Sequence, residues 1–496
     1  MLDRIYEYAI RTPEVIALEG ASTTISYQAL PIEVQHVADW LAAHMPRSSI
    51  ALAMDNSPAW VLVDLAAMTL SLPAIPIPAF FSASQKQHAL QDAGVGMVVT
   101  DDLQSWELLY PHAEVISQRE VAGKVLTLLR VSSSIGEHAA AKITYTSGTT
   151  GQPKGVCLPA QAMWQVASAV HQATQSPQHD RHFCILPLAT LLENVAGVYA
   201  SLLSGATVVI YSCHQVGFTG SQFDIQRLYA GLRETRSTTA ILIPELLRAL
   251  VMLLQTGQHV IDSLRFLAVG GARVSPALLE EAHALGLPVY EGYGLSECAS
   301  VVTLNTPGAG KTGSIGKALP HVQLKLDAAG ELWVKGAVYD GYTHGQQGVL
   351  PASTDADGYI ATGDLAFQDT DGFWYVSGRK KNVLITSFGR NVSPEWVESE
   401  LMFSPHIMQA CVFGEARPFN VAVLVPRATS TAVEIAQAVA QINAGLPDYA
   451  QVADWVIAET SFSPHNSQLT ANGRLKRDQI WQYYQPAIEA VYQEIL

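Results

Sequence analysis

Positive charge is scarce in this chain. Its 496 residues include 29 lysines and arginines against 44 aspartates and glutamates, which gives a formal net charge of −15 at pH 7. A protein that binds the phosphate backbone of a nucleic acid needs a basic face, so this balance argues against DNA or RNA as a partner. Any anionic ligand would therefore need a local basic patch.

Cysteine is also sparse, and no two cysteines lie close to each other in sequence. The five are Cys157, Cys184, Cys213, Cys298 and Cys411. An odd number of isolated cysteines indicates neither a disulfide framework nor the paired spacing of a zinc site. We therefore expect reduced thiols and a cytoplasmic location.

The chain also lacks an uninterrupted apolar run of membrane length. The longest candidate, "VLVDLAAMTLSLPAIPIPAFF" at residues 61–81, contains Asp64 and three prolines. This pattern predicts a helix that leads into a buried strand, and no integral membrane segment. Residues 1–20 contain early acidic side chains and no continuous apolar core, so we expect no signal peptide.

Apolar side chains, in contrast, make up 49% of the residues, enough for a large folded core. The length of the chain predicts about three domains or subdomains. Over most of residues 1–310, helical patterns alternate with short apolar runs such as "SIALAM", "ATVVIY" and "LRFLAVGG". This alternation predicts an α/β fold in which helices cover parallel sheets, and residues 1–310 would form its N-terminal core.

The pattern changes twice towards the C-terminus. Residues 311–380 contain alternating runs with the turns "DAAG" and "DTDG", which predict a small β-rich subdomain of hairpins attached to the N-terminal domain. Residues 381–496 contain a helix, a pair of strands and another helix, which predict a small α+β C-terminal domain.

Residues 145–155, "YTSGTTGQPKG", form the most distinctive stretch. Glycines allow successive N–H groups to turn toward one anion, hydroxyls add donors, and Lys154 adds a mobile positive charge. The stretch lacks the spacing of a Walker phosphate loop. These residues alone are compatible with an ordinary surface loop or with a cradle for a triphosphate.

This stretch resembles the signature loop of the adenylate-forming, or AMP-binding, superfamily, which includes the acyl-CoA synthetases. Further stretches resemble later motifs of that superfamily in the same order: "LRFLAVGGARVSP", "EGYGLSECA" and "YIATGDLAFQDTDGFWYVSGRKK". The resemblance covers nearly the whole chain. It implies a large N-terminal domain, a small mobile C-terminal domain, the use of ATP, Mg²⁺ and CoA, and a small-molecule carboxylate as substrate.

The resemblance also implies where the nucleotide binds. The implied contacts are Thr146, Ser147, Gly148, Thr149, Thr150 and Gly151 in the signature loop, Gly270, Gly271 and Ala272 after a strand, Glu291, Gly292, Tyr293 and Gly294 in the next motif, and Asp364 and Arg379 at the ribose. Absent or tiny side chains would let adenine lie against the backbone, and Tyr293 offers a face for stacking.

The implied catalytic groups include Lys154, Ser296 and Glu297. Ser296 stands where relatives have threonine and keeps the hydroxyl, and Glu297 offers a hard oxygen ligand for Mg²⁺. Lys381 falls on the hinge about which the C-terminal domain of relatives swings.

The stretch "LPLATLLEN" at residues 186–194 resembles an element of long-chain acyl-CoA synthetases. It has no carboxylate at the place that pairs with the ammonium of an amino acid, which favours a plain hydrophobic acid. Thr190 stands where many relatives have a histidine near the reacting carboxylate, and it joins the catalytic candidates. Glu193 matches a glutamate that either helps to hold Mg²⁺ or is a buried structural carboxylate.

Near its C-terminus the sequence departs from the family pattern. Relatives insert a catalytic lysine, and in "LTANGRLKRDQI" that position is Arg474. Arginine has the same charge but is planar and bulkier than lysine. Three interpretations follow: Arg474 acts directly, Lys476 replaces it after a local shift, or adenylation is weakened. The retained glycine–cation spacing favours Arg474.

These motifs predict an ATP-dependent acyl-CoA synthetase for a medium- or long-chain fatty acid or a related hydrophobic carboxylate. One alternative is an acyl-AMP ligase that loads an acyl carrier protein or closes a β-lactone. An alternative of another class is a non-catalytic nucleotide or acyl binder, suggested by the departures at Arg474 and Thr190.

Overall fold

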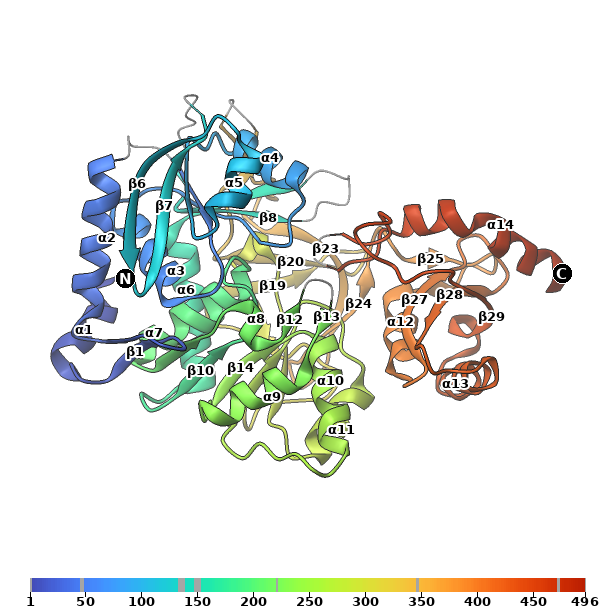
Figure 1. Ribbon diagram of the computed structural model, residues 1–496. Coiled ribbons are helices and arrows are strands. Elements are labelled where there is room, and N and C mark those ends of the chain that lie inside the picture. Colours follow the sequence, from blue (N-terminus) through green and yellow to red (C-terminus); the bar gives the residue numbers. More distant parts are fainter. Residues whose placement is uncertain are drawn as a thin grey trace.

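The structure, a computed structural model, describes residues 2–44, 49–132, 139–146, 153–219, 222–344, 348–470 and 473–495. Their strands form two nine-stranded sheets, a four-stranded sheet, a three-stranded sheet and two small ribbons. Figure 1 shows a large body and, to one side of it, a smaller C-terminal body in orange and red. The α/β class expected from the sequence is confirmed.

The first nine-stranded sheet has a parallel centre. Its order is β18-β17-β16-β15-β14-β10-β11-β1-β2, and the strands from β16 to β1 run parallel. Several apolar runs singled out in the sequence are these strands, as helix-covered parallel sheets require. The bounds are β1 Ile16–Glu19, β2 Thr24–Ser26, β10 Arg181–Cys184, β11 Thr207–Ile210, β14 Thr239–Leu242, β15 Phe266–Val269, β16 Val289–Tyr293, β17 Thr303–Leu304 and β18 Lys317–Ala318.

The second nine-stranded sheet, of order β22-β21-β9-β8-β4-β3-β5-β7-β6, is parallel only at its centre. Hairpins form both sides, because tight turns can join only antiparallel neighbours. The bounds are β3 Ile50–Ala53, β4 Ala74–Pro76, β5 Met97–Thr100, β6 Glu114–Val121, β7 Lys124–Arg130, β8 Lys142–Thr146, β9 Lys154–Leu158, β21 Gly341–Thr343 and β22 Val349–Pro351.

Helices cover the two large sheets and pack against them in three apolar clusters. They are α1 Leu2–Arg11, α2 Leu30–His44, α3 Pro58–Thr69, α4 Ala83–Asp92, α5 Leu103–Leu109, α6 Ala160–Thr174, the π-helix η1 Leu192–Tyr199 with its continuation α7 Ala200–Ser204, α8 Cys213–Val216, α9 Ile225–Glu234, α10 Pro244–Gln255 and α11 Pro276–Ala284. Leu52 of β3, Val166 of α6 and Val208 of β11 belong to one continuous buried cluster, which joins the sheets.

A buried ion pair explains the aspartate in the apolar stretch 61–81, which forms α3 and β4 as predicted. Asp64 Oδ1 lies 2.8 Å from Nζ of Lys142 at the start of β8, and both side chains are 1% exposed. Tyr199 and Asn194 of η1 hydrogen-bond to the same pair. Because a buried charge pair is tolerated only when its hydrogen bonds are satisfied, the network fixes α3 and η1 against the strand that enters the signature loop.

The β-rich region contains the antiparallel four-stranded sheet β19-β20-β23-β24. Both predicted turns are present, and each begins with an aspartate, Asp327 or Asp369, whose carboxylate accepts two backbone N–H groups. The hairpin β21–β22 extends the second large sheet instead, next to β9. The bounds are β19 Val322–Leu326, β20 Glu331–Gly336, β23 Ile360–Gln368 and β24 Trp374–Arg379.

The C-terminal body has a mixed three-stranded sheet, β27-β28-β29, with helices on both faces. One apolar cluster packs α12 and α13 against it and a second packs α14 (Figure 1). The bounds are β25 Leu384–Ile385, β26 Asn391–Val392, α12 Pro394–Phe403, β27 Ile407–Phe413, β28 Asn420–Pro426, α13 Ala432–Gly445, β29 Val452–Ile457 and α14 Arg477–Ile495. Within the described residues, no helix combines the length and apolarity needed to cross a membrane.

Candidate active site

One cavity of about 1040 Å³ collects residues from nearly all the sequence motifs. It opens where strands β14, β15 and β16 end and where the start of β9 faces the C-terminal body. Among the predicted site residues, those that line it are Lys154, Thr190, Gly270, Gly271, Gly292, Tyr293, Gly294, Ser296, Glu297, Arg379, Lys381 and Arg474. Its volume slightly exceeds the usual range of about 300–1,000 Å³ for one ligand, so a nucleotide and an acid could occupy it together.

Other predicted residues lie elsewhere. Ala272 is exposed and absent from the lining, while Glu291, Asp364 and Glu193 are buried behind the wall. Five predicted residues of the signature loop lie outside the described residues: Ser147, Gly148, Thr149, Thr150 and Gly151. The side chain of Thr146 is also outside the described part of the structure. The backbone of Thr146 pairs with Lys154, so the hairpin β8–β9 brings the two ends of the signature loop together.

The charge of the cavity is opposite to that of the whole chain. Its described lining contains one carboxylate, Glu297, and five cations, namely Lys154, Arg379, Lys380, Lys381 and Arg474. Arg379 and Lys380 are paired with Asp364 and Glu331. The remaining excess of positive charge in a concave site favours a polyanion despite the overall charge of −15. The residues thus fit ATP, and Glu297 fits a hard cation such as Mg²⁺.

Tyr342 links two of the predicted catalytic residues, Glu297 and Lys154, a contact that the sequence motifs did not reveal. Its hydroxyl donates to Glu297 Oε1 at 2.8 Å, and Lys154 Nζ lies 5.4 Å from the centre of its ring. Burial raises the pKa of Tyr342, and the charge of Glu297 raises it further, so the phenol remains a donor. The only signal in the sequence was a pair of tyrosines in "VYDGYTHG".

The ends of the signature loop are anchored on α4 and β21. Asp92 at the end of α4 accepts hydrogen bonds from the hydroxyls of Tyr145, at 2.9 Å, and Thr343. Directly after Lys154, a Cβ at Gly155 would lie 2.6 Å from Thr343 Oγ1, so only glycine fits there. This packing determines the direction in which Lys154 leaves the sheet.

Tyr293, Asp364 and Arg379 form a network in the wall of the cavity. Tyr293 donates to Asp364 Oδ2 at 2.6 Å, and Arg379 Nε lies 3.0 Å from Asp364 Oδ1. Burial raises the pKa of Asp364, while the charge of Arg379 opposes this shift. The predicted ribose contacts are therefore neighbours, although Asp364 lies behind Tyr293 and Arg379.

The glycine turns after β15 and β16 pack closely against each other. A Cβ at Gly270 would lie 2.9 Å from the carbonyl oxygen of Gly292. Gly271 has a φ of +85°, a conformation that favours glycine, and a Cβ there would have only Ile243 within 4 Å, at 3.7 Å. The backbone at Gly271 is therefore open to the cavity, as the predicted contact with adenine requires.

Glu291 is separated from the other residues of its motif. It lines a second, smaller cavity of about 390 Å³ and is only 6% exposed. Burial raises its pKa to about 8, with Arg273 opposing the shift. At neutral pH this carboxyl is therefore largely protonated.

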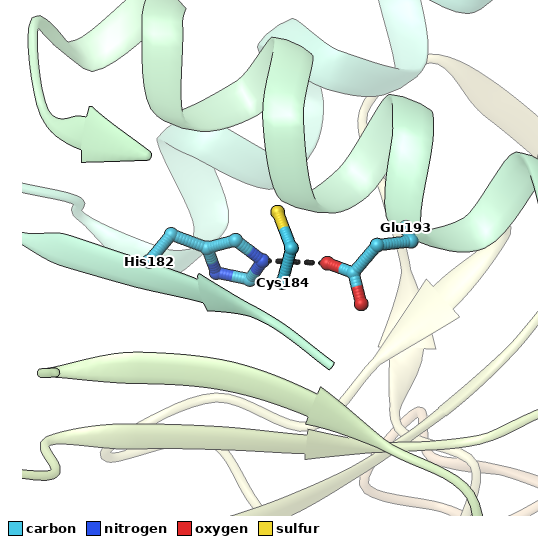
Figure 2. A group of neighbouring side chains, drawn as sticks. All are labelled: His182, Cys184 and Glu193. Carbon is cyan, nitrogen blue, oxygen red and sulfur yellow. Dashed lines mark hydrogen bonds and ion pairs between the residues drawn. The ribbon is translucent and has the colours of Figure 1, made fainter. Parts of the chain in front are cut away.

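Glu193 is fully buried and hydrogen-bonded to protein groups on both oxygens. Oε1 lies 2.8 Å from Nε2 of His182, and Oε2 accepts the N–H of Leu186 at 2.9 Å. Figure 2 shows Glu193, His182 and Cys184 together, and their potential ligand atoms lie within 4.8 Å of one another. The structure thus places Glu193 beside β10 and not in the lining of the large cavity, and its role as a Mg²⁺ ligand stays a prediction.

An antiparallel bridge between Leu469 and Leu475 in the C-terminal body places Arg474 at the cavity. The N–H of Thr470 donates to the carbonyl of Arg474 at 2.7 Å, and Gly473 between them has a φ of +77°. Burial lowers the pKa of Arg474 and the nearby Arg379 lowers it further, while Asp364 and Glu297 oppose the shift. Lys476 is not part of the described lining.

Thr190 lies at the junction between the charged and apolar parts of the cavity. Its hydroxyl donates to the carbonyl oxygen of Pro187 at 2.6 Å and so holds the turn before η1. Leu186, Leu191 and Leu192 line the cavity on either side of it.

Comparison with known proteins places these motifs in a family. The family described as AMP-binding enzyme matches residues 5–343, and that described as AMP-binding enzyme C-terminal domain matches residues 381–495. A 2-succinylbenzoate–CoA ligase of Bacillus subtilis is 29% identical over 420 residues, which cover 81% of this chain and 82% of the relative. A long-chain-fatty-acid–CoA ligase of Mycobacterium bovis is 27% identical, with 87% of this chain and 86% of the relative covered.

Solved structures agree with this assignment. The O-succinylbenzoate coenzyme A synthetase of Bacillus subtilis in complex with AMP superimposes with a TM-score of 0.77 and 25% identity, over 96% of this chain and 97% of that chain. The same enzyme has been solved with ATP and a magnesium ion. Adenylate-forming CoA ligases use ATP, Mg²⁺ and CoA, the three cofactors expected from the sequence. This chain belongs to the AMP-binding enzyme family.

Proposed function

We propose that this chain is an ATP-dependent CoA ligase that activates a hydrophobic carboxylic acid. The acid is first converted to an acyl-adenylate and then transferred to CoA as a thioester. The observation that carries this proposal is the continuity of one cavity, whose cationic end fits ATP and whose other end is an apolar channel. The relatives named as CoA ligases support the same overall reaction.

The channel favours an acid without an amino group. It runs between strands β14 and β15 on one side and η1 and α7 on the other, with Ile241, Phe266, Leu192 and Ala196 in its wall. The one carboxylate in the described lining, Glu297, is bound by Tyr342 and faces the cations. A medium- or long-chain fatty acid suits this lining, as the long-chain ligase among the relatives suggests.

The first step would be driven mainly by fixed positive charge. An oxygen of the acid attacks the α-phosphorus of ATP in line with the departing pyrophosphate, and negative charge builds up on the phosphate oxygens. Lys154 and Arg474 would stabilise this charge, because oriented cations in a cavity shielded from water are effective there. Ser296 would donate a hydrogen bond to the same region.

Glu297 would hold Mg²⁺, which when bound would neutralise part of the phosphate charge. The hydroxyl of Tyr342 leaves the second oxygen of Glu297 free for this purpose and orients the carboxylate. Partners of this kind commonly tune a ligating group. The wall formed by Tyr293, Asp364 and Arg379 would hold the adenosine.

The second step would require the C-terminal body to move. Residues after Lys381 pack around their own apolar clusters, so residues 381–496 could rotate as a unit about Lys381 and withdraw Arg474 from the cavity. Removal of this side chain would open the adenylate to the thiol of CoA.

A second class of acid, aromatic carboxylates, is favoured by one observation. Phe218 and Phe266 line the channel, and aromatic rings pack well against each other. A relative is named for an aromatic acid, 2-succinylbenzoate.

A panel of acids tests these proposals. The purified chain is supplied with ATP, Mg²⁺ and straight-chain or aromatic acids, and pyrophosphate release is measured, followed by thioester formation with CoA or with an acyl carrier protein. We expect pyrophosphate release with medium- or long-chain acids and thioester with CoA. Thioester on the carrier protein alone would contradict CoA as acceptor, and a lack of pyrophosphate with every acid would indicate a non-catalytic binder.

A further inference from the structure

The channel proposed for the acid ends in polar groups. Ile243, at its mouth beside the glycine turns, follows the end of β14, while Thr239 begins the same strand. Four residues of extended strand span about 13 Å, so Thr239 lies about that far from the reacting end. Because β10 and β15 run parallel to β14, His182 and Phe266, near the starts of those strands, lie at the same depth.

Three further hydroxyls line this deep end, from Thr174 at the end of α6, from Ser176 just after it and from Ser201 in α7. Thr174 donates its single hydroxyl hydrogen to the carbonyl of Val170 at 2.8 Å. The hydroxyl of Ser176, 2.8 Å from Thr174 Oγ1, must therefore act as the donor between the two, while it accepts from Nη2 of Arg265 at 3.3 Å. Both hydroxyls then retain one lone pair for a donor in the channel.

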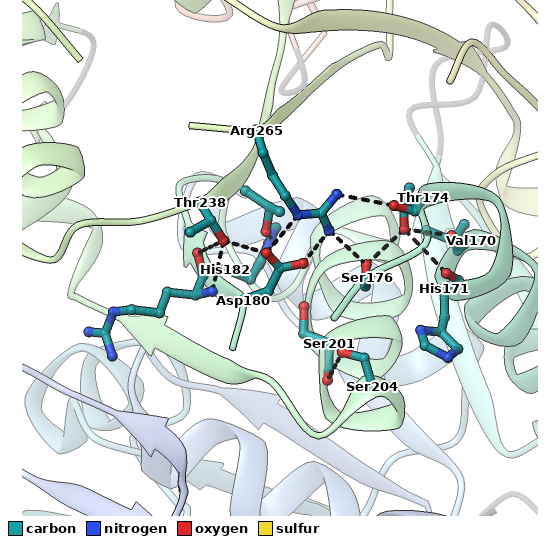
Figure 3. A network of polar contacts seen from close by, with 12 residues as sticks. Val170, His171, Thr174, Ser176, Asp180, His182, Ser201, Ser204, Thr238 and Arg265 are labelled. Carbon is teal, nitrogen blue, oxygen red and sulfur yellow. Dashed lines mark hydrogen bonds and ion pairs between the residues drawn. The ribbon is translucent and has the colours of Figure 1, made fainter. Parts of the chain in front are cut away.

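The charge of Arg265 behind this end of the channel is compensated by an ion pair. Figure 3 shows the guanidinium of Arg265 between Asp180 and Ser176. Nε of Arg265 donates to Asp180 Oδ1 at 2.7 Å, and Nη2 contacts Oδ2, so the carboxylate compensates the cation in a paired geometry. Neither side chain belongs to the described lining of the channel.

Ser201 and Thr239 complete the polar end. Within the described residues, the hydroxyl of Ser201 has no hydrogen-bond partner, although the residue is only 9% exposed. Thr239 shares a hydrogen bond of 3.0 Å with Nδ1 of His182, whose Nε2 lies 2.8 Å from Glu193. The oxygen of this hydroxyl is not fully enclosed by protein: it is open to the channel and free to bond to a ligand group there.

We infer that the acid activated by this chain carries a hydroxyl at its far end, bound by Ser201 together with Thr174 and Ser176. A hydroxyl can donate to the free lone pairs of Thr174 or Ser176 and can accept from Ser201, whereas a methyl end would leave these groups unpaired. A second carboxylate would meet lone pairs and no free cation. This inference rests on the proposed function, since it concerns the acid of the same reaction.

Matched acids test the inference. Pyrophosphate release is measured for straight-chain acids of medium length, each compared with its ω-hydroxy and ω-carboxy counterpart. We expect kcat/KM to be about 10-fold or more higher for the ω-hydroxy acid, because sites with buried hydrogen-bonding groups discriminate against analogues that lack the partner. The difference should lie mainly in KM, since the contact is remote from the reacting atoms.

Ser201→Ala is the decisive variant, because its hydroxyl has no described protein partner and its loss breaks no native hydrogen bond. The variant should lower kcat/KM for the ω-hydroxy acid about 5-fold and raise it for the methyl-terminated acid. Ser204→Ala is the matched control: Ser204 lies in the same helix, donates to the carbonyl of Ser201 at 2.7 Å and does not line the channel. Ser204→Ala should leave the ratio of kcat/KM for the ω-hydroxy acid to kcat/KM for the methyl-terminated acid unchanged.

Three results would overturn the inference: equal kcat/KM for methyl and hydroxyl ends, a preference for the ω-carboxy acid, or the same acid ratio in wild type and Ser201→Ala. If no acid releases pyrophosphate, the proposed reaction fails, and the inference is then tested by binding alone. In that case the ω-hydroxy acid should raise the Tm of wild type more than the methyl-terminated acid does. In Ser201→Ala the two acids should raise the Tm equally. Equal Tm increases in wild type would overturn the inference.

Discussion

At the scale of single residues, Arg474 shows how the cavity concentrates positive charge. The side chain of Arg474 is exposed and lies near Arg379, whose charge disfavours a second cation unless anions are close, and Asp364 and Glu297 meet only part of that need. We expect Arg474→Ala to lower pyrophosphate release about 10²- to 10³-fold, the usual effect of removing a group that stabilises developing charge. Arg474→Lys should retain more activity, since it keeps the charge but loses the planar fork.

Lys476 provides the control for Arg474. It lies two residues further on and outside the described lining, so Lys476→Ala should stay close to wild-type activity. An equal loss of pyrophosphate release in the two alanine variants would show that Lys476 reaches the phosphates as well as Arg474.

Tyr342 allows the metal and the cation to be separated experimentally. Tyr342→Phe removes the hydroxyl that binds Glu297 and keeps the ring beneath Lys154. We expect the Mg²⁺ concentration for half-maximal pyrophosphate release to rise about 10-fold, as for other groups that orient a metal ligand. Tyr359→Phe, in the β-rich region and outside the described lining, is the matched control. If Tyr342→Phe leaves the required Mg²⁺ concentration unchanged, Tyr342 does not orient Glu297 as a Mg²⁺ ligand.

Glu291 makes stability depend on pH. Its pKa is raised from 4.5 to about 8 in the folded chain, so between these values the folded state holds a proton that the unfolded state has lost. Stability from this group is complete below the lower value and falls as the pH rises to the upper one, by at most about 1.4 kcal/mol per pH unit.

Glu291→Gln should abolish that fall. The free energy of unfolding is measured in urea near pH 4.5 and near pH 8, the unfolded and folded pKa values of Glu291. Wild type should lose stability relative to the variant as the pH rises between them. Glu280→Gln, at an exposed position of α11, should follow wild type. Parallel pH profiles of wild type and Glu291→Gln would contradict the raised pKa.

At the scale of elements, the π-helix η1 depends on one glycine. A Cβ at Gly197 would lie 2.6 Å from Nε2 of His182 and would also meet the carboxylate of Glu193. We expect Gly197→Ala to destabilise the fold by about 1–3 kcal/mol, the usual range for overpacking. Gly445→Ala, at the end of α13 with no atom within 4 Å of the added Cβ, should be neutral or stabilising. Urea denaturation of both variants checks this, and equal effects would contradict it.

Individual strands show which elements could be predicted from sequence patterns and which could not. Apolar runs predicted β3, β11 and β15 because a strand buried on both faces needs such a run. The pairing of β21 with β9 could not be predicted, since hydrogen bonding between strands far apart in sequence leaves little trace in either one. The contact between Tyr342 and Glu297 could not be predicted for the same reason, because the pairing of β21 with β9 brings these two residues together.

At the scale of the whole molecule, the two bodies should serve different half-reactions. Lys381→Pro restricts the backbone at the proposed hinge, because proline fixes φ and lacks an N–H. We expect thioester formation from added acyl-adenylate to fall at least about 10-fold, and pyrophosphate release to fall less, as for other hinge variants. Lys381→Ala controls for the side chain. Equal losses in both half-reactions would argue against rotation about this residue.

Local stretches of sequence carry the predicted nucleotide contacts, and among the described ones the cavity brings together Gly270, Gly271, Gly292, Tyr293, Gly294 and Arg379, whose binding role stays a prediction. The deep end of the channel could not be predicted in this way. Thr174, Ser201 and Thr239 lie in unremarkable helices and strands, and only the packing of these elements around one cavity brings them together.

The opposite charges of the cavity and the whole chain affect how quickly anions arrive. At low ionic strength the −15 of the body repels ATP and CoA at long range, whereas the cations act only near the entrance. Salt screens the long-range repulsion first, since the Debye length falls to about 10 Å at 0.1 M. Association rates for both anions should therefore rise with added salt before they fall, the reverse of the usual behaviour of a basic nucleotide-binding surface.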